Sequence, residues 1–221
     1  MEAFRTVLRR AEGEIVEKKS RFIATVLPAE TEREVETFLA ELRKTYWDAN
    51  HNVYAYRIGQ QKMIERFSDD GEPVHTAGLP VLSVLQKEDI RNVCIVVTRY
   101  FGGTLLGTGG LVRAYSKAAQ EALRAGIVIQ KEEYVRYYID MDYTQLGRIQ
   151  YGVLRAGLTL LDTEYTEGVR MRLLVSHSDA ARFQQDITEM SDGKLKPVEE
   201  GRIWAAQAEG TWYYFDPPQE K

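Results

Sequence analysis

The sequence predicts an α/β (α+β) fold with two domains, one over residues 1–133 and the other over residues 134–216. Two observations lead to this prediction. Segments with the period-2 hydrophobic pattern of strands alternate with segments that have the 3.6-residue period of helices. From residue 135 the order is strand, helix, strand, strand, helix, strand, which is typical of a ferredoxin-like domain. We therefore expect a two-layer sheet-and-helix domain followed by a ferredoxin-like domain.

The first half divides into short strands and three helices. Strands are expected over 14–18, 21–26, 52–58, 63–67, 92–98 and 127–130, and helices from Thr31, over 76–86 and over 111–125. Thr31 and Glu34 have the spacing of a capping box, and an apolar stripe at positions 35, 38, 39 and 42 follows them. These features place the start of the first helix at Thr31.

The remaining elements of this half follow from apolar runs and glycines. Residues 52–58 present side chains suited to two faces of a sheet, and the turn to the partner strand is expected at 59–61. The continuous β-branched run at 92–98 predicts the central strand. Gly126 is expected to end the third helix.

In the second half, strands are expected over 135–142, 159–165, 169–176 and 202–209, and helices over 143–157 and 179–190. Apolar side chains at 180, 183, 187 and 190 share one face of the last helix.

Composition and charge exclude several classes of protein. The formal net charge is −4, so a strongly basic nucleic-acid-binding protein is excluded. Residues 1–135 carry 19 basic and 19 acidic side chains, whereas residues 136–221 carry 10 and 14, so attraction for phosphate is expected in the first half. The single cysteine, Cys94, excludes an intramolecular disulfide and lies in an apolar run typical of a core. With strand-sized apolar runs and no apolar leader, we expect a cytoplasmic protein without a membrane partner.

A glycine-rich loop, TRYFGGTLLGTGG (98–110), connects the central strand to the third helix. Its paired glycines, Gly102 with Gly103 and Gly109 with Gly110, allow positive φ and close approach of another group. A helix that opens there would direct unpaired N–H groups outward and favour an anion. The same region supplies three cations and a stacking candidate: Arg99, Arg113, Lys117 and Tyr100. The alternative is a tight crossover loop without a ligand, since neither a Walker A nor a GxGxxG spacing is present.

A second loop, SDDGEPVH (68–75), is acidic. It contains Asp69, Asp70, Glu72 and His75, which together suit a divalent metal or general acid–base chemistry. In the alternative, the carboxylates cap the following helix and pair with cations such as Arg66 or Arg99. Convergence of His51 with these side chains is also open. No ligand from elsewhere is evident, so the metal remains unknown, and no catalytic residue or cofactor is assigned.

Aromatic and basic residues are interleaved across the first half, a composition that suits stacking of bases beside neutralised phosphates. The aromatic and histidine members are Tyr46, Trp47, His51, Tyr54, Tyr56, Tyr100, Phe101 and Tyr115. The same side chains also suit cores and edge strands, so this pattern alone does not distinguish a nucleic-acid-binding surface from ordinary packing.

Six motifs in order resemble the IMPACT family, in particular its bacterial YigZ-type members. They are KKSRFIA (18–24), HNVYAYR (51–57), SDDGEP (68–73), TAGLPVL (76–82), VVTRYFGG (96–103) and GTGGLVRAY (107–115). The sequence departs from the family pattern at Val74 and His75, and at Leu105, where the family often has a lysine.

The resemblance implies a first domain similar to domain IV of elongation factor G and a second similar to its domain V. It implies a link to translation, since eukaryotic members compete for a ribosome-associated activator of a stress kinase. It implies no catalytic residue.

Three functions remain open at this point. The first is a non-enzymatic, translation-associated regulator that binds RNA or the ribosome through the glycine-rich loop. The second is a phosphate- or nucleotide-binding enzyme that uses the same loop with a carboxylate-held metal. The third is a module that binds a protein partner.

Overall fold

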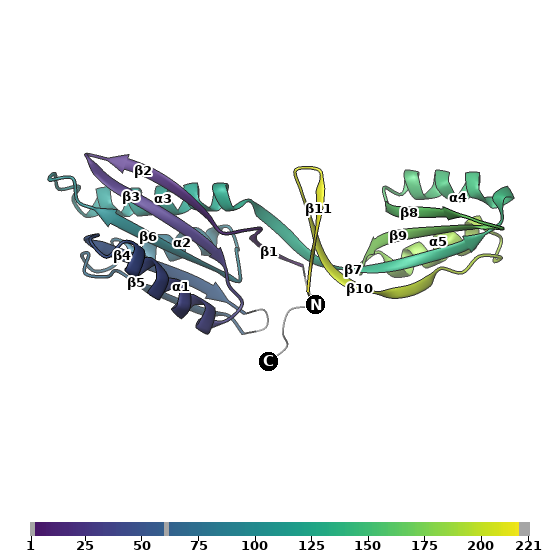
Figure 1. Ribbon diagram of the computed structural model, residues 1–221, viewed down its shortest axis with the longest axis horizontal. Coiled ribbons are helices and arrows are strands. Elements are labelled where there is room, and N and C mark those ends of the chain that lie inside the picture. The colour runs from purple at the N-terminus through teal and green to yellow at the C-terminus, as the bar shows by residue number, and fades with distance from the viewer. Residues whose placement is uncertain (1–2, 60–61, 217–221) are drawn as a thin grey trace. The chain divides into compact units, whose positions relative to one another are not determined.

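The computed structural model describes residues 3–59 and 62–216 and divides into two compact units, one spanning Phe4–Gln130 and the other beginning at Lys131 (Figure 1). The mixed α/β fold class is as predicted. Within the described residues, no helix is both long enough and apolar enough to cross a membrane.

The first unit is built on an antiparallel sheet of five strands in the order β2-β3-β6-β4-β5. The five strands of this sheet are β2 (Ala11–Glu17), β3 (Ser20–Pro28), β4 (His51–Ile58), β5 (Ile64–Ser68) and β6 (Val93–Tyr100), and the unit also contains β1 (Phe4–Val7), which lies outside this sheet. Its helices are α1 (Glu32–Thr45), α2 (Gly78–Lys87) and α3 (Thr108–Gly126). The β-branched run forms the central strand, β6, as predicted, and Thr31 with Glu34 forms the predicted capping box of α1.

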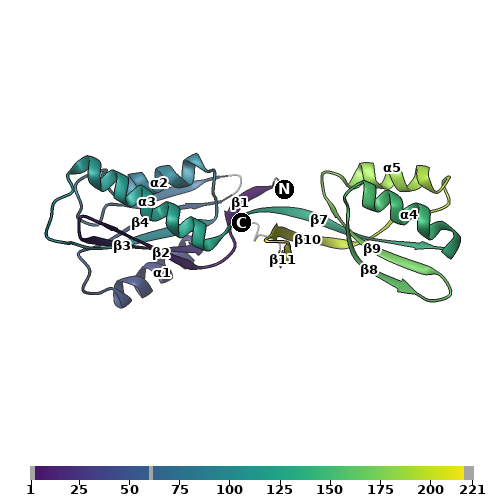
Figure 2. The same cartoon turned by 90° about the horizontal axis from the view of Figure 1, so that it is seen from above.

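Helices cover both faces of this sheet. Helix α1 lies on one face, and α2 and α3 lie on the other (Figures 1 and 2). Val53 and Ala55 of β4 pack with α2 and α3, whereas Tyr56 and Ile58 of the same strand pack with α1. This follows from the alternation of side chains along a strand. The first unit therefore has a helical layer on each side of the sheet, one layer more than the two that the sequence predicted.

The second unit has the ferredoxin-like order β10-β7-β9-β8, extended at one edge by β11. Its elements are β7 (Val128–Met141), which begins within the first unit, α4 (Tyr143–Arg155), β8 (Thr159–Tyr165), β9 (Val169–Ser176), α5 (Ala180–Met190), β10 (Val198–Ala208) and β11 (Thr211–Phe215). Helices α4 and α5 pack on one face through Ile149, Val153, Phe183 and Ile187 (Figure 2). The predicted apolar face of α5 is thus confirmed.

Several element boundaries differ from the prediction. The two strands expected over 127–130 and 135–142 are one continuous strand, β7, because the alternation runs through Lys131, which is buried at an inward position. The short strands β1 and β11 had not been expected. The predicted turn at 59–61 falls partly on residues 60–61, which lie outside the described residues.

Candidate functional site

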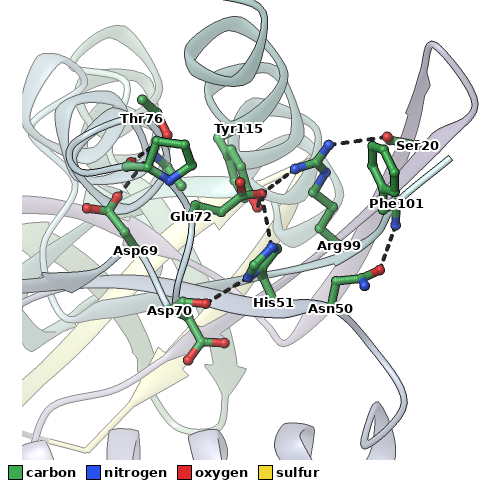
Figure 3. A network of polar contacts seen from close by, with 12 residues as sticks. Ser20, Asn50, His51, Asp69, Asp70, Glu72, Thr76, Arg99, Phe101 and Tyr115 are labelled. Atoms are coloured by element: carbon green, nitrogen blue, oxygen red, sulfur yellow. Dashed lines mark hydrogen bonds and ion pairs between the residues drawn. The ribbon is translucent and has the colours of Figure 1, made fainter. Parts of the chain in front are cut away.

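Four loops of the first unit meet at one end of its sheet, and we call this region the loop end. It comprises the β2–β3 turn (18–19), the α1–β4 loop (46–50), the β5–α2 loop (69–77) and the β6–α3 loop (101–107). The N–H of Phe101 donates to Asn50 Oδ1 at 2.8 Å (Figure 3). The N–H of Gly102 donates to Ser20 Oγ at 3.1 Å. These bonds tie the glycine-rich loop to both neighbouring segments.

A buried ion pair lies beneath the loop end (Figure 3). Arg99 Nη1 donates to Glu72 Oε1 at 2.6 Å, and the Tyr115 hydroxyl donates to the same oxygen at 2.7 Å. All three residues are buried. His51 Nε2 lies 3.9 Å from this oxygen, and His51 Nδ1 lies 2.8 Å from the carbonyl oxygen of Asp70. His51 therefore does lie beside the acidic loop, where it is part of a polar network centred on Glu72.

Burial and the negative charge of Glu72 raise the pKa of the Tyr115 phenol above its ordinary value. Tyr115 therefore remains a neutral hydrogen-bond donor. Arg99 is the cation that balances Glu72, and its guanidinium carbon lies 5.3 Å from the Phe22 ring centroid and 5.6 Å from that of Phe101. Arg99 thus faces inward, not toward solvent.

The other carboxylates of the acidic loop support the backbone. Asp69 accepts hydrogen bonds from the N–H groups of His75, Ala77 and Gly78, the last two at the start of α2. Asp70 Oδ2 accepts from the N–H of Asn52 at 2.6 Å. The sequence offered two interpretations of the acidic loop. These contacts match the second, in which its carboxylates cap the following helix and pair with a cation such as Arg99.

Within the part of the chain that the structure describes, no group of three or more His, Cys, Asp or Glu side chains is placed to hold a metal ion. His75 is exposed and contacts Phe67, its ring lying edge-on with centroids 6.0 Å apart. Arg66 pairs with Glu32 of α1, not with the acidic loop.

The glycines of the β6–α3 loop have distinct roles. A Cβ on Gly102 would lie 2.0 Å from the carbonyl carbon of Lys19, so this position requires close approach of two backbones. Gly103 has φ +79° and open space around it. Gly109 and Gly110 lie in the first turn of α3, whose N-cap, Gly107, makes no side-chain capping bond. The helix therefore begins at Thr108, three residues before the predicted start at 111, and both glycines lie within its first turn.

Cations surround this loop on the outside. Arg113 and Lys117 are exposed one turn apart on α3, and Lys18 and Lys19 are exposed in the β2–β3 turn. Among the described residues, none of the four forms an ion pair with a carboxylate. The predicted site did not include Lys18 and Lys19. Two successive lysines at the junction of two predicted strands could have indicated an exposed basic turn.

Large apolar side chains are also exposed at the loop end. Trp47 is 81% exposed, Phe101 45% and Leu105 83%. Tyr100 is half-buried, and its hydroxyl donates to Asp48 Oδ1 at 2.8 Å. The loop end therefore combines outward cations with exposed aromatic rings.

Comparison with known proteins assigns the chain to a family. Residues 18–123 match the Impact N-terminal domain, and residues 139–194 match a domain of unknown function, DUF1949. The chain is 38% identical over 203 residues to the IMPACT family member YvyE of Bacillus subtilis, an alignment that covers 92% of this chain and 93% of YvyE. The chain belongs to the IMPACT family.

Other IMPACT relatives extend over most of the chain. The IMPACT family member YigZ of Escherichia coli is 33% identical over 181 residues, covering 81% of this chain and 89% of YigZ. A solved structure described as that of a hypothetical protein is 31% identical and has a TM-score of 0.56, covering 91% of this chain and 100% of that one.

Proposed function

We propose that this IMPACT-family protein is a non-enzymatic, translation-associated regulator that binds RNA, free or within the ribosome, through the loop end of its first unit. The link to translation is supported by family membership, because the resemblance implies regulation of translation by eukaryotic members. The choice of RNA is supported by the arrangement of charges at the loop end.

The observation that carries the proposal is that the carboxylates of the loop end accept hydrogen bonds from the protein itself, whereas its exposed cations have no acidic partners among the described residues. The carboxylates of the four loops are Asp48, Asp69, Asp70 and Glu72, and each accepts a hydrogen bond from the protein itself. Lys18, Lys19, Arg113 and Lys117 are instead exposed and without acidic partners among the described residues. Exposed cations around a backbone with paired glycines suit a chain of phosphates.

Arg99 takes a different role in this proposal from the one expected from the sequence. Arg99 is only 5% exposed, and its guanidinium is paired with Glu72. We therefore propose that Arg99 holds the loops in place through Glu72, and that the exposed lysines and Arg113 contact phosphate. The alternative of a nucleotide enzyme is less favoured, because the carboxylates that would hold its metal are engaged in hydrogen bonds to the protein.

The test is the salt dependence of affinity for a labelled RNA oligonucleotide. The variant replaces Lys18, Lys19, Arg113 and Lys117 with glutamine, and each lost phosphate contact should lower the slope of log affinity against log salt by about 0.7 for a single strand. We expect affinity at low salt to fall and the slope to decrease by about 3 in total.

A matched control replaces Lys87 and Arg124, exposed cations at the C-terminal ends of α2 and α3, with glutamine. It should bind as the unmodified protein does. Equal affinity and slope for the four-residue variant, in a folded protein, would remove the basis of the proposal.

A further inference from the structure

We infer that the loop end is selective for single-stranded RNA and stacks unpaired bases on Trp47 and Phe101. This inference rests on the proposed function and specifies which form of RNA the site takes.

Phe101 is held as a rigid platform. Its N–H is bonded to Asn50 (Figure 3), and the next N–H, that of Gly102, is bonded to Ser20, so the backbone is held at two successive residues. The Arg99 guanidinium lies 5.6 Å from the ring centroid, and Arg99 is itself fixed by Glu72. Phe101 is nevertheless 45% exposed. Binding a base there would not require the side chain to be ordered first.

Trp47 lies on a segment that is tied to the same strand end. Two bonds join this segment to β6: Tyr100 donates to Asp48 Oδ1 at 2.8 Å, and the N–H of Asn50 donates to the carbonyl of Arg99 at 3.0 Å. Trp47 is 81% exposed, whereas Trp204 of the second unit is 2% exposed. A large indole left in water on an anchored segment suits a partner with a flat apolar face.

The surrounding charge identifies that partner as a nucleic acid strand. The exposed cations of the β2–β3 turn and of α3 belong to the same loop end as the aromatic rings and have no carboxylate partners among the described residues, which suits a polyanion better than an apolar protein surface. In a duplex the base faces are already stacked on one another, so only an unpaired strand can use both the cations and the rings.

The test compares a fluorescently labelled single-stranded RNA with the duplex of the same sequence, using the full chain and the variants Trp47→Leu and Phe101→Leu. Leucine keeps an apolar side chain of substantial volume but has no aromatic face. We expect each variant to bind the single strand about tenfold more weakly, since stacking is worth roughly 1–3 kcal/mol per base and 1.4 kcal/mol is a factor of ten. Affinity for the duplex should not change, and Tyr151→Leu, at an exposed tyrosine of α4, should bind both RNAs normally.

A second readout follows the fluorescence of Trp47 directly. The single strand should quench tryptophan emission of the unmodified protein, and the quench should be lost in Trp47→Leu. If both leucine variants retain full affinity for the single strand while the four-glutamine variant loses it, RNA binding stands and the stacking inference is wrong. If the four-glutamine variant also binds normally, the proposed function itself fails. Equal affinity of the unmodified protein for single strand and duplex likewise contradicts the inference.

Discussion

The side chain of Arg99 is held at the loop end by three kinds of contact. It pairs with the Glu72 carboxylate, lies near two aromatic rings and donates to Ser20 Oγ at 3.4 Å. Removing one partner of a buried ion pair leaves the other charge buried without compensation, which is more costly than removing both.

We expect Arg99→Met to lower the free energy of unfolding by about 3–5 kcal/mol, because Glu72 then stays buried without its cation. The double variant Glu72→Leu with Arg99→Met should lose less than the sum of the two single variants. Urea unfolding followed by circular dichroism measures both quantities. Additive losses in the double variant would show that the two side chains do not interact as the structure indicates.

Tyr115 gives a dependence on pH whose sign is fixed by burial. Burial, together with the charge of Glu72, raises the pKa of Tyr115 above its ordinary value of 10.0. The unfolded chain therefore loses this proton first as pH rises, so the stabilisation is complete below about pH 10 and is lost above it.

We expect the free energy of unfolding to fall above about pH 10 more steeply in the unmodified protein than in Tyr115→Phe, by up to about 1.4 kcal/mol per pH unit. Unfolding measured at a series of pH values in both proteins tests this. Parallel curves would mean that Tyr115 ionises equally easily in the folded and unfolded chains.

The sequence showed which charged residues were close along the chain but not which way they would face. Pairing of the acidic loop with Arg99 was one of two interpretations, and capping of the next helix by Asp69 belonged to the same one. The inward direction of Arg99 depends on the register of β6 with β3 and β4, which places it beside residues far away in sequence. That register is a tertiary property, and residue spacing does not determine it.

At the scale of elements, the β6–α3 loop contains glycines required for different reasons. Gly102 packs against the backbone of the β2–β3 turn. Gly103 has open space around it, and glycine is favoured there because φ is positive. The paired-glycine pattern predicted both close approach and positive φ, but it did not indicate which residue served which purpose.

We expect Gly102→Ala to be the more damaging of two alanine substitutions. A Cβ at Gly102 would overlap the Lys19 carbonyl carbon at 2.0 Å, so the turn has to move, whereas Gly103→Ala should cost only about 1–2 kcal/mol for a left-handed alanine. Thermal unfolding of the two variants ranks them. Equal losses would indicate that the turn moves without cost.

Strand β7 shows where hydrophobic patterning misled the prediction. The prediction ended one strand at 130 and began the next at 135, yet Lys131 between them is buried and its ammonium lies 4.8 Å from the Phe215 ring centroid. The long aliphatic stem of lysine allows it to occupy an inward position in a strand. A pattern that counts lysine as polar therefore divides a continuous strand.

At the scale of the molecule, the two units present different surfaces. On the second unit's sheet, Arg172 pairs with Asp162, Glu164 and Glu200, and Arg170 pairs with Asp140, so these arginines are neutralised by neighbouring carboxylates. The net charge of the second half is also the more negative. Arginines of the first unit, such as Arg21 with Glu14, are paired in the same way, so it is the net charge that favours the first unit as the part proposed to bind RNA.

Binding of ribosomal RNA by the loop end can be measured by co-sedimentation of the full chain with ribosomes on sucrose gradients at low and high salt. We expect the protein to move with ribosomal particles at low salt and to be released at high salt, and we expect the four-glutamine variant to stay at the top of the gradient in both. The Lys87 and Arg124 control should move as the unmodified protein does. If the four-glutamine variant still moves with the ribosomes, the assignment of RNA binding to the loop end is wrong. If the unmodified protein remains at the top at both salt concentrations, the ribosome is not its partner, and only binding of free RNA is left of the proposal.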